Sequence, residues 1–114
     1  KAVLTDIVRK KTRPGRFSYN DKAGIEIVSS NKASFISMEL VLEPGGSTKL
    51  EENAEGSEIL LIVTKGKIIA DIHNEVHSLW VGDSIYFKSH LPHHFENREK
   101  KPAKGLIIQT PKSF

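Results

Sequence analysis

Cysteine is absent from this sequence of 114 residues. Without thiols the chain can form no disulfide and offers neither a thiolate metal ligand nor a cysteine nucleophile. Long apolar runs are also missing, since residues 59–63 and 105–108 fall far short of the roughly 20 residues that span a bilayer. No basic stretch followed by an apolar segment opens the chain, so no signal peptide is visible. These absences favour a cytoplasmic protein with no membrane partner.

The length predicts one domain, because about 100–150 residues is the commonest domain size. A chain of this size buries about two-thirds of its unfolded surface and needs no covalent staple. The first residue is Lys1 rather than Met, which suggests a processed chain or a piece excised from a longer protein. We divide the sequence into a basic N-terminal arm or linker, residues 1–16, and a globular domain, residues 17–114.

The charge balance is mildly basic, with a net charge of +3 and a pI of about 9.2. Nucleic-acid-binding proteins usually concentrate their basic residues on one face or along one helix. The sequence shows one basic cluster, which consists of Arg9, Lys10, Lys11, Arg13 and Arg16. We interpret this cluster as a solvated arm, with a DNA-contacting arm as the alternative.

Short β-branched and aromatic segments separated by turn residues indicate an all-β chain. No window carries an apolar repeat of period 3.6 over a dozen residues, so long helices are not expected. The predicted strands are 17–19, 25–28, 34–42, 58–64, 67–72, 75–80, 84–87, 93–96 and 105–109. His73 and Asn74 fit a two-residue hairpin loop, because Asn tolerates positive φ. So many short strands favour two facing sheets in a jelly roll, which leaves few exposed strand edges.

Three stretches of the sequence resemble, in order and spacing, the two motifs of the cupin family. The stretches are 42–66, 82–87 and 91–97. The second cupin motif has a glycine, a strand, a turn, a histidine and an asparagine four residues later, which Gly82, His93 and Asn97 match. The resemblance covers about residues 25–114 and implies the cupin double-stranded β-helix, a jelly-roll barrel.

The end of the chain carries a more specific resemblance. A cupin that closes on a strand and the tail Thr-Pro-Lys-Ser-Phe, residues 110–114, is similar to the C-terminal sensory domain of bacterial helix-turn-helix regulators of the XRE type. This resemblance implies a homodimer that binds a small-molecule effector. It also implies that DNA is contacted only through a domain absent from this chain, with residues 1–16 as the linker. A dimerisation cupin with an empty interior is a further alternative.

The metal-ligand positions of the family can be located on this sequence by the resemblance. Catalytic cupins bind a divalent metal through two histidines and a glutamate of the first motif and a histidine of the second. Counting back from Gly66, the glutamate position is Ile59, and the histidine positions are Asn53 and Glu55. Only His93, in the second motif, matches. An aliphatic side chain cannot ligate a cation, and a tight site needs three or four protein ligands.

We therefore predict no metal cofactor and no enzymatic activity. If a metal bound, its ligands would be His93, Glu55 and Asn53. A shifted loop could bring Glu51, Glu52 or Glu58 inward, although a one-residue slip in a strand reverses the face of every side chain. The alternative function is a metal-dependent cupin enzyme, namely a dioxygenase, isomerase or lyase.

Strand parity predicts which side chains line the barrel, because alternate residues of a strand face the same side of a sheet. The expected ligand-binding residues are Ile59, Leu61, Val63, Phe87, His93, Phe95 and Asn97. This mostly apolar set with two polar members suits a small-molecule pocket. Leu60 and Ile62 then face outward and need a cover, from the N-terminal segment or a partner subunit, which is our reason for predicting a dimer.

The remaining aromatic and imidazole side chains carry weaker signals. His90 and His94 are assigned to the surface, because neighbouring strand residues face opposite sides and His90 falls in a loop. His73 and His77 lie at a hairpin and are assigned to turn and surface positions. Trp80 is interpreted as a core or interface residue, with ligand contact as the alternative.

Overall fold

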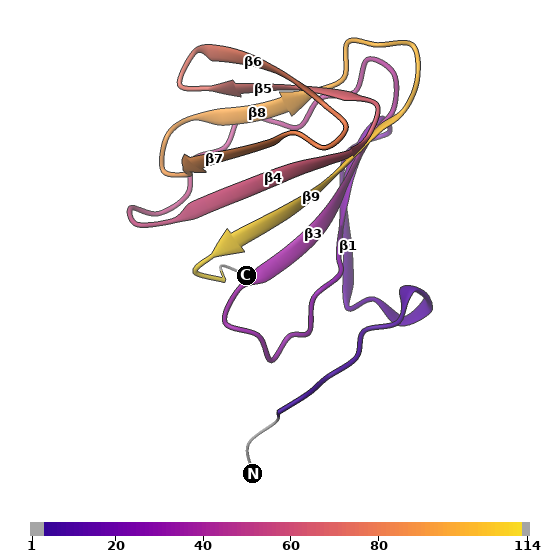
Figure 1. The fold of residues 1–114 in the computed structure, drawn as a ribbon, viewed down its shortest axis with the longest axis vertical. Helices are drawn as coiled ribbons and strands as arrows, with labels where there is room; N and C mark the ends of the chain where they lie inside the picture. Colours follow the sequence, from indigo (N-terminus) through magenta and orange to yellow (C-terminus); the bar gives the residue numbers. More distant parts are fainter. Residues whose placement is uncertain (1–3, 113–114) are drawn as a thin grey trace.

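A computed structural model describes residues 4–112, and within this range the chain has nine strands and one short 3-10 helix (Figure 1). The elements are η1 (Lys10–Thr12), β1 (Gly15–Asn20), β2 (Ala23–Ile27), β3 (Ile36–Leu42), β4 (Glu58–Lys65), β5 (Lys67–Ile72), β6 (Glu75–Trp80), β7 (Ser84–Lys88), β8 (His93–Glu96) and β9 (Ala103–Thr110). Every predicted strand is present, with ends that differ by at most two residues. The all-β class is confirmed.

The strands form two antiparallel sheets that face each other. The larger sheet has the order β1-β2-β3-β9-β4-β7, and the smaller has the order β6-β5-β8. In Figure 1 the smaller sheet lies above the larger one, and the chain crosses repeatedly between them. Strands distant in sequence are thereby neighbours: β9 lies between β3 and β4. This is the jelly-roll barrel that the sequence predicts.

The core lies between the sheets and follows the alternation of β4. Ile59, Leu61 and Val63 are buried, whereas Leu60 and Ile62 are half-buried on the opposite face, as parity predicts. Each fully buried aliphatic side chain of this kind stabilises the fold by about 2 kcal/mol. Packing at the centre is tight, because a Cβ atom at Gly105 would lie 2.7 Å from the Leu61 side chain.

The turns use the residues that their backbone angles require. His73 and Asn74 have φ of 51° and 65°, so both adopt the left-handed conformation of a two-residue hairpin, as predicted. Gly66 has φ of 69° and turns β4 directly into β5. A side chain at Gly66 would also approach the carbonyl oxygen of Pro102 to 2.7 Å. This turn therefore brings β5 close to the β8–β9 loop.

The basic segment before the barrel is partly packed against it. Arg13 donates hydrogen bonds to Glu26 at 2.7 Å and to Glu39 at 3.3 Å, and its side chain is only 17% exposed. Arg16 also bonds to Glu26, at 3.0 Å. The interpretation of this cluster as a solvated arm is wrong for Arg13, because two carboxylates of β2 and β3 hold its guanidinium on the sheet. Strand β1 begins at Gly15.

Candidate functional site

The barrel interior contains a cavity of about 160 Å³. Its walls come from β1, β2, β3, β4 and β9 of the larger sheet, from β8 of the smaller sheet and from the loop before β4. The lining residues are Tyr19, Ile25, Met38, Glu51, Asn53, Ile59, Phe95, Ile107 and Gln109. The walls are thus mostly apolar, and the polar groups enter from the loop and from two strands.

The loop between β3 and β4 places polar side chains at the cavity because it runs back along β8. The backbone N–H of Glu51 donates to the carbonyl of His93, and the N–H of His93 donates to the carbonyl of Glu51, both at 2.9 Å. Two residues later, the N–H of Asn53 donates to the carbonyl of Ser89 at 2.8 Å. Glu51 and Asn53 share one face of this extended segment, and both reach the cavity.

Two hydrogen-bond acceptors of the cavity lining are the carboxylate of Glu51 and the amide oxygen of Asn53. The Tyr19 hydroxyl donates to Oε1 of Glu51 at 3.0 Å. Burial raises the pKa of Tyr19, and the neighbouring Glu51 charge raises it further, so this hydroxyl keeps its proton at neutral pH. Oδ1 of Asn53 is buried and accepts no hydrogen bond from any described residue. An unpaired buried acceptor costs about 1–3 kcal/mol, which a ligand donor would recover.

His93 lies in an aromatic cluster beside the cavity. The residue is 3% exposed, and its ring centroid is 5.0 Å from that of Phe87 and 6.2 Å from that of Phe95. Nδ1 of His93 is 2.8 Å from the carbonyl oxygen of Leu91. Since a carbonyl only accepts, Nδ1 carries a proton and the ring orientation is fixed. The structure therefore places His93 inside the barrel, as parity predicts.

The predicted ligand-binding residues are all buried, but they occupy different places. Ile59 and Phe95 line the cavity. Leu61 and Val63 are 0% and 1% exposed and belong to the packed core. Phe87 lies with His93 in the aromatic cluster described above.

The Asn97 side chain forms its hydrogen bonds with backbone groups. Its amide nitrogen donates to the carbonyl of Leu42 at 3.1 Å and to that of Lys101 at 2.7 Å. Its Oδ1 accepts from the N–H of Glu99 at 2.9 Å. The side chain thus fastens the end of β8 to β3 and shapes the β8–β9 loop, and it is absent from the cavity lining.

Several cavity residues are missing from the parity prediction. Tyr19, Ile25 and Met38 come from strands β1 to β3, and Ile107 and Gln109 come from β9. The alternation of buried and outward residues along β9 was a usable signal for the last two, because Gln109 pairs with Ile59 and Ile107 pairs with Leu61. The inward position of Glu51 depends on the course of a loop, for which the sequence has no periodic signal.

The residues at the family's metal positions do not fit a metal centre. The glutamate position holds Ile59, a buried aliphatic side chain. The Glu55 side chain is 88% exposed and lies 4.0 Å from His90, while Asn53 supplies one neutral oxygen. Among residues 4–112, no three His, Cys, Asp or Glu side chains gather closely enough to hold a metal ion. His93 therefore has no partner ligands among them.

Comparison with known families decides the classification. Residues 38–109 match the cupin domain family Cupin_2. This chain is a cupin. The match covers all three stretches in which the sequence resembles the family motifs, so the recognition from Gly82, His93 and Asn97 is confirmed. No curated protein matches the chain.

Solved structures with the same fold have different functions. The Cupin_2 domain of an XRE family transcriptional regulator from Enterobacter cloacae superposes with a TM-score of 0.73 at 16% identity, over 78% of this chain and 96% of that one. A cupin sugar phosphate isomerase from Silicibacter pomeroyi gives 0.77 at 19%, over 92% and 75%. Hydroxypropylphosphonic acid epoxidase from S. wedmorenis gives 0.77 at 19%, over 91% and 58%. Sequence identities this low show a shared cupin fold, so the function must be argued from the residues of the site.

The described part of the cupin holds no helix of the length and apolar character needed to cross a membrane.

Proposed function

We propose that this cupin binds a small-molecule effector in its barrel cavity and is the sensory, dimerising domain of a transcriptional regulator. The DNA-binding domain would lie outside this chain, and the regulator would work in the cytoplasm. The observation that carries the proposal is a pair of acceptors, Glu51 and Asn53, in a cavity with apolar walls. Apolar walls exclude water, and a few polar groups orient a ligand. The likeness to the cupin domain of an XRE regulator supports the proposal.

The acceptors define the chemistry of the effector. Glu51 keeps one carboxylate oxygen beyond the one that Tyr19 occupies, and the Asn53 oxygen is unpaired. A ligand that carries a hydrogen-bond donor on a short apolar body would satisfy both, and an ammonium group would also complement the carboxylate charge. The cavity of about 160 Å³ equals the liquid volume of about five water molecules, so the effector is small.

The test compares small ligands that differ only in the polar group. We would titrate 1-butylamine, 1-butanol and butyrate by calorimetry and follow the thermal midpoint, with and without a chelator. The expected order of affinity is amine, alcohol and then carboxylate, because butyrate would place a second anion beside Glu51. A chelator should change none of these values.

Two variants and a matched control assign the binding to the cavity. Glu51→Gln removes the charge and should erase the preference for the amine. Asn53→Leu should weaken binding of both donors about tenfold, and it should raise the stability of the free protein because it removes a buried unpaired acceptor. Glu52→Gln, at the exposed neighbouring acid, should leave binding unchanged.

Other outcomes would contradict the proposal. Turnover of a bound compound, or binding that requires an added divalent metal, would support the alternative cupin enzyme. If the reading frame upstream of this chain encodes no DNA-binding domain, the assignment to a transcriptional regulator fails.

The outer face of the larger sheet supports the dimerisation part of the proposal. Leu60 lies between Tyr86 of β7 and Ile108 of β9, and in the next row Ile62 lies beside Leu106. The aliphatic members of this face are half-buried, and Tyr86 is 57% exposed. An outward apolar cluster on three adjacent strands is the kind of surface that a second subunit covers.

Light scattering tests the dimer. Ile62→Lys places a charge in the centre of this face and should give a monomer at micromolar concentration. Val76→Lys changes an exposed apolar residue of β6 in the same way and should leave a dimer. A monomeric unmodified cupin would overturn this part of the proposal while leaving ligand binding open to its own test.

A further inference from the structure

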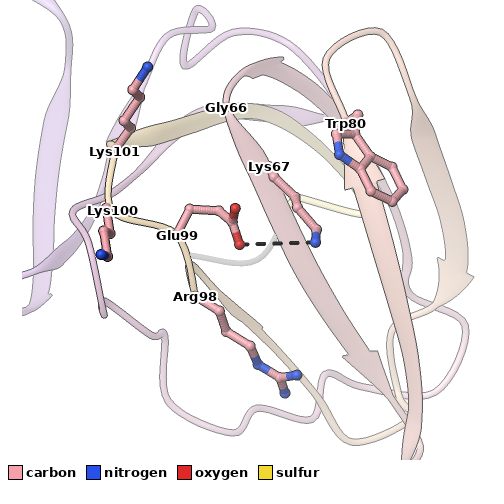
Figure 2. A pocket seen from close by; sticks show the side chains of 7 residues that line it. All are labelled: Gly66, Lys67, Trp80, Arg98, Glu99, Lys100 and Lys101. Carbon is pink, nitrogen blue, oxygen red and sulfur yellow. Dashed lines mark ion pairs between the residues drawn. The ribbon is translucent and has the colours of Figure 1, made fainter.

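A second hollow lies on the surface, at the end of the barrel where β4 turns into β5. It is a groove of about 630 Å³ between the start of β5, the end of β6 and the β8–β9 loop (Figure 2). The groove residues are Gly66, Lys67, Trp80, Arg98, Glu99, Lys100 and Lys101. Four of these seven residues are basic and one is acidic.

The basic side chains of the groove are only partly neutralised. Figure 2 shows the ion pair between Lys67 and Glu99, whose charged atoms are 4.0 Å apart. Arg98 bonds to Glu96 at 2.6 Å. Lys100 and Lys101 are exposed and form no ion pair with any residue from 4 to 112. The groove therefore presents an uncompensated positive charge.

Two further lysines flank the groove residues along the chain. Lys65 of β4 and Lys104 of β9 are paired across the strands and form no ion pair within the described range. Like charges directly opposite each other are unfavourable, and a bound anion would offset the repulsion. This surface corrects the interpretation that the segment around residues 9–16 is the only basic cluster. The fold assembles a second one in the groove from Lys67, Arg98, Lys100 and Lys101.

An exposed tryptophan forms one wall of the groove. Trp80 is 55% exposed, although the Lys67 ammonium lies over its ring, 4.9 Å from the centroid. Of the interpretation of Trp80 as a core or interface residue, the core part is therefore wrong, and the interface part stays a prediction. The indole N–H donates to no described residue, and the backbone N–H bonds to Asp83 at 2.9 Å, which fixes the strand end and leaves the ring free to contact a ligand.

We propose that this groove binds a single strand of nucleic acid, with backbone phosphates on Lys100 and Lys101 and a base against Trp80. Basic grooves with an exposed aromatic ring suit this ligand, because every base has a flat face and every nucleotide a charge. An anion without rings would make no use of Trp80, and an apolar ligand would make no use of the lysines. The proposal is independent of the effector cavity, since the groove and the cavity share no lining residue.

Trp80 supplies the first measurement, because it is the single tryptophan of the chain. Titration with a short oligothymidylate should quench its fluorescence as the base approaches the indole ring. The logarithm of the binding constant should fall linearly with the logarithm of salt concentration, with a slope of about −1.4 for the two phosphate contacts at Lys100 and Lys101. Absence of quenching under saturating conditions at low salt would overturn the proposal.

Charge variants locate the binding. Lys100→Gln with Lys101→Gln should lower oligonucleotide affinity about tenfold at low salt and reduce the slope by about 1.4. Lys49→Gln with Lys88→Gln removes the same charge from exposed lysines outside the groove and should change affinity by less than about twofold. Equal losses in both pairs would show attraction to net charge alone and would overturn the assignment to the groove.

Trp80→Ala separates nucleic acid from other polyanions. With a fluorescently labelled oligonucleotide, anisotropy should show a loss of about tenfold, because stacking of one base is removed. Affinity for inorganic polyphosphate should stay unchanged, and circular dichroism should confirm that the variant folds. If polyphosphate or polyglutamate binds the unmodified cupin as tightly as the oligonucleotide, the ligand is a general anion or an acidic protein and the proposal fails.

Discussion

The barrel interior and the groove differ in what holds their polar side chains in place. In the interior, the Tyr19 hydroxyl bonds to Glu51, and the backbone of Glu51 is fixed to β8. In the groove, Lys100 and Lys101 extend from a loop into solvent. Changes in the interior therefore alter folding and binding together, whereas changes in the groove alter charge with little effect on folding. This difference allows mutations to separate the two proposed activities.

The largest expected effect tests the independence of the two regions. Leu61→Ala removes a fully buried side chain in contact with β9 and should destabilise the cupin by about 3 kcal/mol, because the tightly packed core collapses poorly around the space. Denaturant unfolding measures this value. Oligonucleotide affinity, measured well below the unfolding transition, should stay unchanged. Val76→Ala, at an exposed position, should change stability by less than about 0.5 kcal/mol.

A parallel loss of oligonucleotide affinity in Leu61→Ala would show that the groove depends on core packing.

Asn97 connects the barrel to the groove, because its side chain bonds both to the end of β3 and to the loop that carries the groove lysines. Its replacement should have the next largest effect. Asn97→Ala leaves the carbonyls of Leu42 and Lys101 without their donor and should cost about 2 kcal/mol in unfolding free energy. Because Asn97 also shapes the loop that carries Lys100, oligonucleotide affinity should fall severalfold. Asn97→Asp keeps the acceptor for the N–H of Glu99 but sets a carboxylate oxygen against the two carbonyls, so it should destabilise the cupin at least as much as Asn97→Ala. Unchanged groove affinity in Asn97→Ala would mean that the loop holds its shape without this side chain.

The dependence of stability on alkaline pH tests the burial of Tyr19 in the cavity wall. The folded cupin raises the pKa of Tyr19 above its ordinary value of 10.0, by burial first and by the Glu51 charge second. The unfolded chain releases this proton at a pH where the folded chain retains it, so stability is complete below about pH 10 and is lost as pH rises further. Tyr19→Phe should flatten the fall in unfolding free energy between about pH 9 and pH 11.

Tyr86→Phe is the matched control for this measurement. The pKa of Tyr86 is also raised, by its hydrogen bond to Glu58, but this pair is exposed to solvent. Water screens an exposed pair, so the control should flatten the curve much less. An equal effect of both variants would contradict the burial of Tyr19 as the main cause.

The sequence was sufficient for the strands, the jelly-roll class and the family, because these depend on local alternation and short motifs. Ile59, Leu61 and Val63 alternate with Leu60 and Ile62, and the burial of β4 follows this pattern. The alternation depends only on the pleat of one strand. The inward position of His93 follows from the same rule.

The cavity and the groove depend on contacts between distant segments, which no local pattern encodes. Glu51 reaches the cavity only because its loop pairs with β8. Tyr19 lines the cavity only because β1 forms one edge of the larger sheet. In the groove, Lys67 and Trp80 are cross-strand partners, and the β8–β9 loop joins them through the barrel topology. The run of basic residues from 98 to 104 was visible in the sequence, but its aromatic neighbour was not.

The smallest expected effect compares the two basic regions directly. Arg16 bonds to Glu26 at 3.0 Å, so its charge is already balanced, whereas Lys100 has no carboxylate partner among residues 4–112. A paired cation releases few counterions when a phosphate approaches, so Arg16→Gln should change oligonucleotide affinity by less than about twofold, and Lys100→Gln should weaken it by more. Both substitutions remove one charge from an exposed side chain, which makes them matched. If Arg16→Gln weakens binding as much as Lys100→Gln, the N-terminal segment contacts the nucleic acid and the ligand extends beyond the groove.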